Sequence, residues 1–116
     1  MRGIREAEAI EKVSIFWTNA NGMDMEVKID FLNKKKTILA LGDGKEKVSE
    51  NWNTEKFESF FREEVIPEVN QHREENVKGE QRILWRIVIQ GRENRITQNG
   101  FKEYPKYWEK LLKYIL

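Results

Sequence analysis

Apolar and polar residues alternate along two stretches near the start of the chain. Residues 13–18 and residues 25–31 place an apolar side chain at every second position, and β-branched and aromatic residues are prominent among them. A period of two is typical of a strand with one buried and one exposed face. Residues 37–41 predict a third strand, and segments 19–22 and 33–35, which both begin with Asn, predict the turns between these strands.

A period of three and four residues replaces this alternation later in the chain. It predicts an amphipathic helix with the apolar side chains Phe57, Phe60, Phe61 and Val65. Asn53 or Thr54 is expected to cap this helix. Pro67 is expected to kink or end it, because the ring removes a donor and clashes with the preceding turn. Residues 45–50 are expected to be a charged loop, and the polar residues 70–80 a loop or a fraying helical end.

The C-terminal part of the chain shows both periods. Residues 83–89 predict a fourth strand and residues 95–97 a short fifth one. A last helix is expected to contain Pro105 in its first turn. Its apolar stripe consists of Trp108, Leu111, Leu112 and Ile115. The predicted fold is α+β, an antiparallel sheet of about five strands in the order β-β-β-α-β-β-α with both helices packed on one face.

Length and composition indicate a small globular domain. A chain of 116 residues has room for one core, so residues 1–116 are expected to form a single compact domain, with residues 1–9 fraying or forming a short lead-in. Aromatic residues make up 11% of the chain, and each buries a large area, so a core can form although 35% of the residues are charged. The formal net charge is +1. This balance disfavours a nucleic-acid-binding protein, which usually has a basic excess.

Several kinds of chemistry lack the residues that they need. The chain has no cysteine, which removes disulfides, thiol nucleophiles and thiolate metal sites. His72 is the single histidine, so we expect no metal site and interpret this side chain as solvated. Residues 42–46 predict a turn and not a phosphate-binding loop, because Leu39 and Glu46 stand where the Walker pattern requires Gly and Ser or Thr. We expect no cofactor and no enzymatic activity.

The compartment is predicted from features at the N-terminus and from composition. The first residues are charged and lack the apolar run of a secretory signal. No window approaches the roughly 18 apolar residues that a membrane helix needs. Absence of cysteine suits a reducing compartment. We therefore expect a cytoplasmic protein that does not act at a membrane.

The face of the sheet opposite the helices is the first candidate binding surface. We expect it to carry six partner-binding residues: Phe16, Lys28, Arg82, Leu84, Arg86 and Val88. Arginine beside aliphatic and aromatic side chains is typical of protein–protein hot spots. The alternative interpretation is ordinary sheet surface, or a face covered by a loop or by the N-terminal segment.

Two basic groups are further candidates. Four lysines share a face at the last helix and would suit an acidic partner or a phosphate backbone: Lys102, Lys106, Lys110 and Lys113. Lysine near a helix C-terminus also favours the helix dipole, and Glu109 can pair with Lys113, so a purely structural role is the alternative. A looser group consists of Arg82, Arg86, Arg92 and Arg95. It would need aromatic partners to stack single-stranded nucleic acid, and Trp85 is expected to point into the core.

Residues 80–116 carry a sequence resemblance. The segment W-R-I-V-I at 85–89 and the segment G-F-K-E-Y-P-K-Y-W at 100–108 resemble the ending of a group of small bacterial proteins without an established activity. That group ends in a W-x-L/I-x-I strand, a short hairpin, a G-x-N-A-Y-P segment and a terminal amphipathic helix. Gly100, Tyr104 and Pro105 match its spacing, whereas Lys and Glu at 102–103 replace the Asn and Ala. The resemblance implies a bacterial protein and brings no activity with it.

The resulting hypothesis is a non-enzymatic interaction domain that binds another protein through a face or edge of its sheet. Small size and balanced charge suggest, within that class, an immunity or anti-defence protein that blocks a partner. A nucleic-acid or small-ligand binding module using the Arg- and Lys-bearing face is the alternative, and salt separates the two because phosphate contacts weaken steeply with ionic strength. A self-assembling structural protein, such as a homodimer, is the further alternative.

Overall fold

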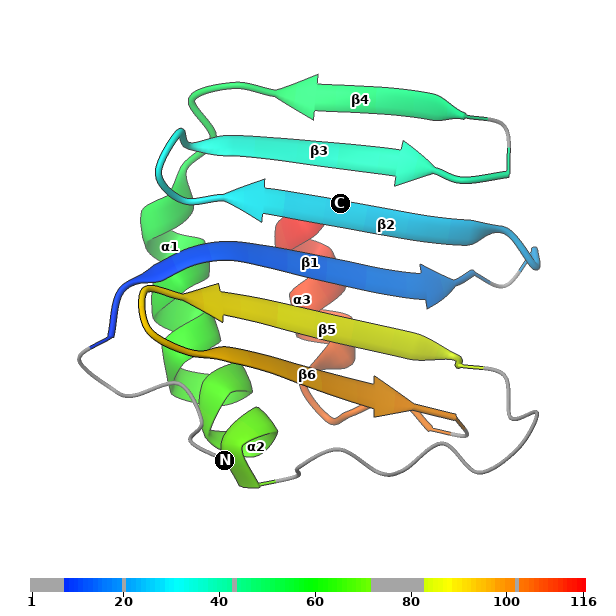
Figure 1. Ribbon diagram of the computed structural model, residues 1–116. Coiled ribbons are helices and arrows are strands. Elements are labelled where there is room, and N and C mark those ends of the chain that lie inside the picture. Colours follow the sequence, from blue (N-terminus) through cyan, green and yellow to red (C-terminus); the bar gives the residue numbers. More distant parts are fainter. Residues whose placement is uncertain (1–7, 20, 43, 72–82, 102) are drawn as a thin grey trace.

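The computed structural model describes residues 8–19, 21–42, 44–71, 83–101 and 103–116. These residues form a six-stranded antiparallel sheet with helices beside it (Figure 1). The strands are β1 (Ile10–Thr18), β2 (Asp24–Asp30), β3 (Lys35–Ala40), β4 (Lys45–Ser49), β5 (Trp85–Gly91) and β6 (Arg95–Gly100). The helical elements are α1 (Thr54–Phe60), the π-helical turn η1 (Phe61–Val65), α2 (Ile66–Gln71) and α3 (Trp108–Ile115). The predicted α+β class with an antiparallel sheet is confirmed.

The strand order places the first strand at the centre of the sheet. The order is β4-β3-β2-β1-β5-β6, so β1 pairs with β2 on one side and with β5 on the other. Val13 of β1 lies opposite Ile29 of β2 and Ile89 of β5. A slip of one residue would turn every apolar side chain of a strand to the wrong face, so the shared alternation specifies this register.

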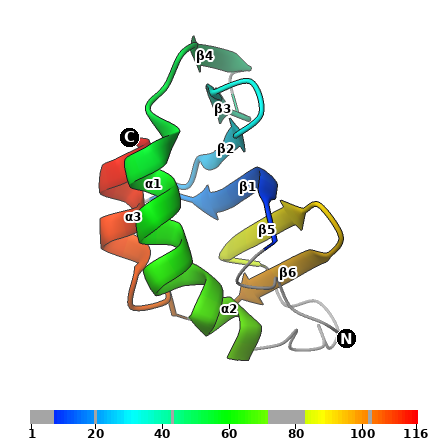
Figure 2. The same ribbon diagram turned by 90° about the vertical axis from the view of Figure 1, so that its left-hand side faces the viewer.

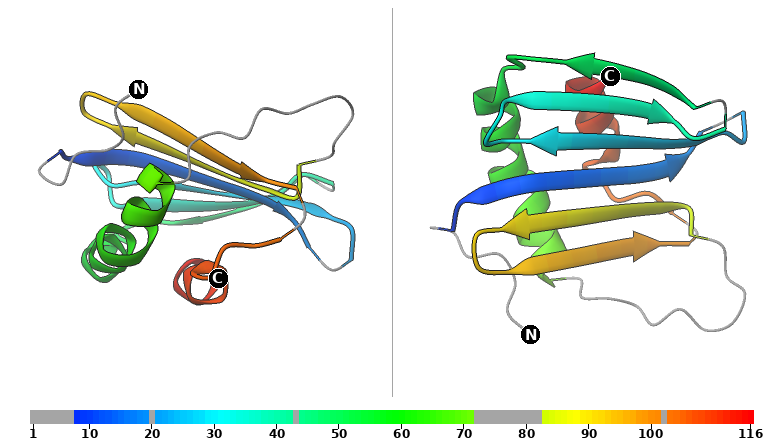
Figure 3. Two further views of the ribbon diagram at one scale, coloured as in Figure 1. Left: turned by 90° about the horizontal axis from the view of Figure 1, so that it is seen from below. Right: turned by 45° about the horizontal axis from the view of Figure 1, so that its top comes forward.

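Both helical segments pack on one face of the sheet, as predicted (Figures 2 and 3). Ile15, Val27 and Ile87 of the three central strands are fully buried. Phe57 and Leu111, from the two helical segments, are also fully buried and belong to the same core cluster. Burying a side chain of this size contributes about 1.5–3 kcal/mol, so this layer between sheet and helices is the main source of stability.

In the described part of the chain, no helix has the length and apolar character required to cross a membrane.

Tryptophans fill the core near α3. The ring of Trp108 lies 6.1 Å from that of Trp17 and 5.7 Å from that of Trp85, measured between centroids. The indole nitrogen of Trp85 donates a hydrogen bond of 2.7 Å to the carbonyl of Glu103. The indole also packs directly on Gly100, where an added Cβ would collide with it. The expected inward direction of Trp85 is therefore confirmed, and its neighbour at position 100 has to lack a side chain.

The expected loop at residues 45–50 is wrong, because residues 45–49 form the edge strand β4. This strand pairs antiparallel with β3, and Val48 lies opposite Thr37. Its sequence, KEKVS, lacks the apolar alternation that marks a half-buried strand, and most of its side chains are exposed. Lys45 and Lys47 suit an edge, since charges there discourage pairing with another chain. The turn predicted at residues 42–46 is shorter, because residues 45 and 46 already belong to β4, and Gly44 directly before the strand has a φ of 71°.

The first helix does not end at Pro67. Asn53 caps α1 as expected, and its side chain accepts a hydrogen bond from the amide of Glu55. The helical segment then passes through η1, where the amide of Ile66 donates to the carbonyl of Phe61, five residues earlier. A π turn is wider than an α turn, and it lies where the proline ring would otherwise crowd the preceding turn. The chain therefore remains helical through Gln71. Residues 70–80 were expected to be a loop or a fraying helical end. Of these, residues 72–80 lie outside the described part.

The last helix begins later than the sequence suggests. α3 starts at Trp108, whose amide donates to the carbonyl of Pro105 in a preceding turn. Pro105 thus lies before the helix and not in its first turn. The α3 side chains Trp108, Leu111 and Ile115 are buried, as the predicted stripe requires, and Leu112 is half-buried.

Glu8 shows that the chain does not fray at residue 8, so of the two expectations for residues 1–9 the short lead-in fits this residue. Its side chain is buried, and its carboxylate accepts hydrogen bonds from the amides of Glu93 and Asn94 and from the side-chain amide of Asn94, at 2.7–2.8 Å. The carbonyl of Glu8 accepts a bond of 2.7 Å from the guanidinium of Arg62 in η1. The chain before β1 is thereby anchored to the β5–β6 turn and to the helical layer at residue 8. Residues 1–7 lie outside the described part.

Two further polar side chains face the core. The ammonium of Lys36 donates to the carbonyl of Ile115 at 3.0 Å and lies 4.9 Å from the centroid of the Trp52 ring. Burial lowers the pKa of Lys36, and the charge of a nearby lysine lowers it further. The hydroxyl of Tyr107 donates to the side-chain oxygen of Gln98, and burial raises the pKa of that phenol above its ordinary value. Both contacts join the sheet to the segment at α3.

Candidate functional site

The face of the sheet opposite the helices is the candidate site, here called the open face. In the edge-on view of Figure 3, α1 and α3 lie on one side of the sheet, and no described element covers the other side. One row of open-face residues, from β4 to β6, consists of Val48, Thr37, Lys28, Ser14, Val88 and Thr97. The neighbouring row consists of Glu46, Leu39, Glu26, Phe16, Arg86 and Asn99. These two rows form the middle of the face.

Apolar side chains are frequent in the middle of the open face. Phe16 and Val88, on the two central strands β1 and β5, are half-buried. Leu39 is also half-buried, and Val48 on the edge strand is 43% exposed. None of these four side chains belongs to the core cluster between sheet and helices. The face therefore presents apolar area to the outside between its charged groups.

Leu84 lies at one end of this face, and its environment partly differs from the expectation. Its amide donates to the carbonyl of Gly100 and its carbonyl accepts from the amide of Thr18, so it extends the pairing of β5 by one residue. The side chain is half-buried and packs against the core cluster. Leu84 thus contributes to packing as well as to the surface, which makes it a poor position for a surface-only mutation.

Charged side chains flank Phe16 in its row. Glu26 lies opposite Phe16 on β2, and Arg86 lies opposite it on β5. The guanidinium of Arg86 donates a hydrogen bond of 2.8 Å to the side-chain oxygen of Asn99, which fixes its position over β6. Glu26 pairs with Lys28 on its own strand at 3.5 Å. Aromatic and arginine side chains are enriched in protein interfaces, so Phe16 and Arg86 are the two residues of this row that favour an interface.

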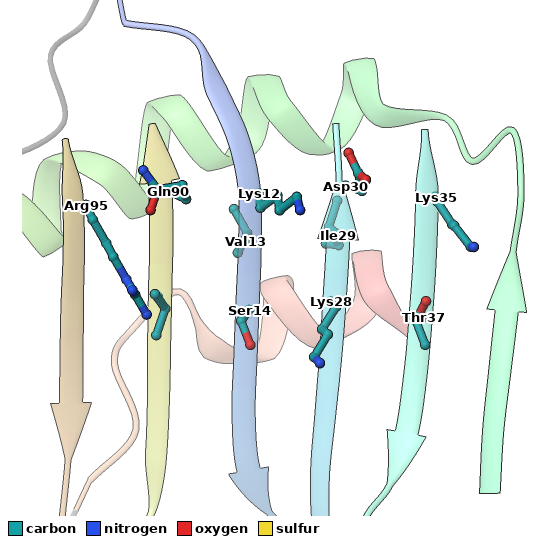
Figure 4. Close-up of a pocket in the computed structure, with 11 residues that line it drawn as sticks. Lys12, Val13, Ser14, Lys28, Ile29, Asp30, Lys35, Thr37, Gln90 and Arg95 are labelled. Carbon is teal, nitrogen blue, oxygen red and sulfur yellow. The ribbon is translucent and has the colours of Figure 1, made fainter. Parts of the chain in front are cut away.

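A depression of about 370 Å³ lies toward one end of the open face (Figure 4). It is open to solvent and crosses strands β1, β2, β3, β5 and β6. Its charged and polar lining residues are Lys12, Ser14, Lys28, Asp30, Lys35, Thr37, Gln90 and Arg95. Val13, Ile29 and Val88 complete the lining. Four cationic side chains and one carboxylate therefore surround this depression.

The carboxylate of Asp30 accepts its hydrogen bonds within the turn after β2. It accepts hydrogen bonds from the amides of Leu32 and Asn33 and from the side-chain amide of Asn33, at 2.8–3.2 Å. The side-chain bond from Asn33 is the main cause that lowers the pKa of Asp30, and Lys12 adds a smaller electrostatic contribution. Asp30 thus stays ionised, and its hydrogen-bonding capacity is directed toward its own turn.

The open face is polarised in charge. Its basic end, defined by Lys12, Lys28, Lys35 and Arg95, contains a single carboxylate, Asp30, in the depression. Its acidic end, defined by Asp24, Glu26 and Glu46, contains Arg86 as its cation. Such a distribution orients a charged partner along the strand direction, although the chain as a whole is nearly neutral.

The predicted partner-binding residues are brought together in part. Phe16, Lys28, Arg86 and Val88 lie on the open face in adjacent positions of three strands. Leu84 lies at its end, and Arg82 lies outside the described residues, as does His72.

The structure describes three of the four lysines that were predicted to share a face at the last helix. Lys106 precedes α3 and Lys102 lies outside the described residues. The ammonium of Lys110 pairs with the carboxylate of Glu64 in η1 at 2.6 Å, and this hydrogen bond raises the pKa of the lysine. Lys110 thus links two helical segments, although its side chain stays 56% exposed, and Lys106 and Lys113 are also exposed. A basic surface at the last helix therefore stays a prediction, with one of its lysines paired to Glu64.

The sequence interpretation missed most of the depression. Lys12, Ser14, Lys35, Thr37 and Gln90 were not predicted as site residues, although the parity of each strand assigns them to the open face. What was missing is the strand order, because the five strands that supply the lining become neighbours only after β5 pairs with β1. Within the described residues, no group of three His, Asp or Glu side chains converges as a metal site would require.

Comparison with protein-family models, with curated proteins and with solved structures gave no match. The resemblance of residues 80–116 to the ending of a bacterial group stays a prediction. The functional argument therefore rests on the geometry of the open face.

Proposed function

We propose that this protein is a non-enzymatic interaction domain that binds another protein through the open face of its sheet. The observation that carries the proposal is the exposed row in which Phe16 lies between Glu26 and Arg86, with Leu39 and Val88 close by in register. Half-buried apolar side chains outside the core gain stability when a partner removes their remaining surface from water.

The polar groups of the face support a protein partner over other ligands. Arg86 is held in place by Asn99, so little side-chain freedom remains to be lost on binding. The basic end and the acidic end together favour a partner with complementary charges of both signs. A uniform polyanion such as a nucleic-acid backbone would be repelled by the acidic end.

Site-specific crosslinking tests the proposal. A photo-crosslinking amino acid is placed at position 16, and in a control protein at position 116, where Leu116 is 64% exposed at the end of α3. We expect one protein of the source cell to be captured from position 16 and not from position 116. Recovery of the same proteins from both positions, or of none from position 16, would refute the proposal.

A direct binding measurement on the purified, captured partner completes the test. The double variant Phe16→Ser/Arg86→Glu is expected to lose at least about 100-fold in affinity, since an aromatic and an arginine anchor each commonly contribute 2 kcal/mol or more at hot spots. The control Lys113→Glu/Leu116→Ser makes the same two kinds of change away from the open face and should bind like the wild type. Circular dichroism and thermal unfolding establish that both variants are folded.

The narrower proposal is that binding blocks the partner, as immunity and anti-defence proteins do. It rests on the small size and balanced charge of the chain. The test adds increasing amounts of the domain to the purified partner and follows the partner's own activity. Full inhibition at one equivalent supports a blocking role, and unchanged activity in the saturated complex contradicts it.

A further inference from the structure

We propose that the depression at the basic end of the open face is a binding site for a small oligoanion, meaning a ligand that carries at least two phosphate or carboxylate groups. The site shares Ser14, Lys28, Thr37 and Val88 with one row of the middle of the face, and its other lining residues lie outside the two middle rows. It therefore goes beyond protein binding and can be tested separately from it.

Three cationic side chains surround Ser14 at the centre of the depression. Lys12 lies on the same strand, Lys28 lies directly opposite Ser14 on β2, and Arg95 extends from β6 toward β5 (Figure 4). The hydroxyls of Ser14 and Thr37 and the three cationic groups are all hydrogen-bond donors suited to oxyanions. The lining thus combines positive charge with neutral donors on one concave surface.

The one carboxylate in the lining does not cancel this preference for anions. Asp30 already accepts hydrogen bonds from Leu32 and Asn33 in the turn after β2. Its charge offsets one of the four cations, and both Lys12 on β1 and Lys35 on β3 lie directly opposite it in the strand register. Glu26 pairs with Lys28 at 3.5 Å and offsets a second cation, so two positive charges remain for a ligand at this end of the face.

The spacing of the cations determines that the ligand must have more than one anionic group. Neighbouring strands lie about 4.8 Å apart, so β1 and β6, two intervals from each other, are separated by roughly 10 Å. The side chain of Lys35 on β3 points toward β4, away from Ser14, so a single oxyanion near Ser14 does not contact Lys35 together with Arg95 (Figure 4). A ligand with two or more anionic groups spans this distance.

The depression is also suitable in size and rigidity. Its volume of about 370 Å³ is in the range of small-molecule sites, which begins at about 300 Å³. Ser14, Lys28 and Val88 lie on strands that are paired on both sides, so the floor is formed before a ligand arrives. Pre-formed donors lose little freedom on binding.

Nuclear magnetic resonance titration of the full-length chain tests the site. Pyrophosphate, ATP and citrate are each added, with adenosine and monovalent acetate as controls for base stacking and for a single carboxylate. We expect shifts of the amide signals of residues 12–14, 28–30, 88–90 and 95 with the three oligoanions and none with either control. Preference for pyrophosphate and ATP over citrate identifies phosphate as the ligand group, and the reverse order identifies carboxylate.

Matched variants distinguish a site from general charge attraction. Lys12→Gln/Arg95→Gln removes two cations from the depression and is expected to weaken oligoanion binding at least about tenfold. Lys106→Gln/Lys113→Gln removes two exposed cations elsewhere and should leave the affinity unchanged. Phe16→Ser/Arg86→Glu should retain the site, so that failure of the oligoanion site and failure of the protein-binding face give different results.

Four results would overturn the inference, and three of them come from the experiments above. The first is an equal loss of oligoanion affinity in Lys12→Gln/Arg95→Gln and in Lys106→Gln/Lys113→Gln. The second is binding of adenosine as tight as that of ATP. The third is a set of amide shifts spread over the whole surface of the protein. A single-stranded oligonucleotide that binds far more tightly than pyrophosphate, with contacts along all six strands, would also overturn it in favour of a nucleic-acid surface.

Discussion

The buried carboxylate of Glu8 gives a prediction whose magnitude can be worked out from its contacts. Replacing Glu8 with Ala removes three hydrogen bonds of 2.7–2.8 Å to residues 93 and 94. A hydrogen bond to a charged group contributes about 1.5–3 kcal/mol, but three bonds to one acceptor are not additive, and water replaces part of them. We expect the free energy of unfolding to fall by about 3 kcal/mol.

Thermal and urea unfolding of Glu8→Ala measure this loss. At an unfolding entropy of about 2.1 cal/mol/K per residue, a chain of 116 residues loses roughly 4 °C of Tm per kcal/mol, so a drop of about 12 °C is expected. Glu50→Ala, at an exposed position, is the matched control and should stay within about 0.5 kcal/mol of the wild type. A Glu8→Ala variant as stable as this control would show that the anchor contributes nothing, and the reasoning would be wrong.

A second substitution tests whether the loss arises at this contact. A Cβ at Gly91 would collide with the Glu8 carboxylate, so Gly91→Ala must displace a side chain that three hydrogen bonds hold. We expect this change to cost about 1–3 kcal/mol in the wild type, as overpacking usually does. In the Glu8→Ala background the nearest obstacle is gone and only the Asn94 carbonyl, 3.2 Å from the new Cβ, still crowds it, so Gly91→Ala should cost less. Costs that add without any coupling would refute direct contact between the two positions.

Three further predictions concern stability. Gly100→Ala should destabilise the protein by about 1–3 kcal/mol, because the new methyl group collides with the indole of Trp85, and near-ultraviolet circular dichroism should show the disturbed tryptophan environment; an unchanged spectrum and Tm would contradict this. Tyr107→Phe should cost about 1 kcal/mol at pH 8, since it leaves the buried oxygen of Gln98 without that donor. Burial holds the pKa of Tyr107 above its unfolded value near 10, so the unfolded state loses the proton first and stability falls as pH rises above about 10. Urea unfolding between pH 8 and 11 should show a smaller fall in Tyr107→Phe than in the wild type, and parallel curves would contradict the linkage. Asn53→Ala should cost about 1 kcal/mol by removing the cap of α1, whereas Asn53→Asp should cost far less; equal losses would contradict the capping role.

The pattern of apolar and polar residues was sufficient to predict an element where one of its faces is buried and the other is exposed to solvent. The alternation at residues 25–31 predicted β2 within about a residue, and the spacing of Phe57 and Phe61 predicted the helix at the right place. Asn53 was one of two cap candidates, with Thr54, because the chemistry of a cap acts within three residues, and the structure selects Asn53. In each case, the signal and the structure depend on the same short segment of chain.

Local pattern failed where a distant partner decides the conformation. β4 has no apolar alternation of its own and is a strand because β3 offers it a ladder of hydrogen bonds. The helix continues past Pro67 because a π turn precedes the ring and the buried side chains of both halves pack on the sheet. In the sequence, Glu8 is one of several charged residues in a polar N-terminal segment. Its hydrogen-bond donors are in the β5–β6 turn, more than 80 residues away, so no local pattern identifies it.

The candidate site divides in the same way. Strand parity was enough to assign Phe16, Lys28, Arg86 and Val88 to one face, and the structure places them there. Parity could not show that Lys35 and Arg95 border the same depression, because they lie on β3 and β6 at opposite sides of it. Strand parity also could not show that Lys110, a lysine of the predicted basic face, pairs with the carboxylate of Glu64.

The sequence by itself determined the α+β class, the two amphipathic helices, most strands and the direction in which their side chains point, because these depend on periodicities of two and 3.6 residues that any short segment carries. The tertiary structure alone decided the strand order, the sixth strand, the anchoring of Glu8 and the gathering of cations at one end of the open face. All of these depend on pairing between segments far apart in the chain, and β5 beside β1 is the pairing from which the rest follow.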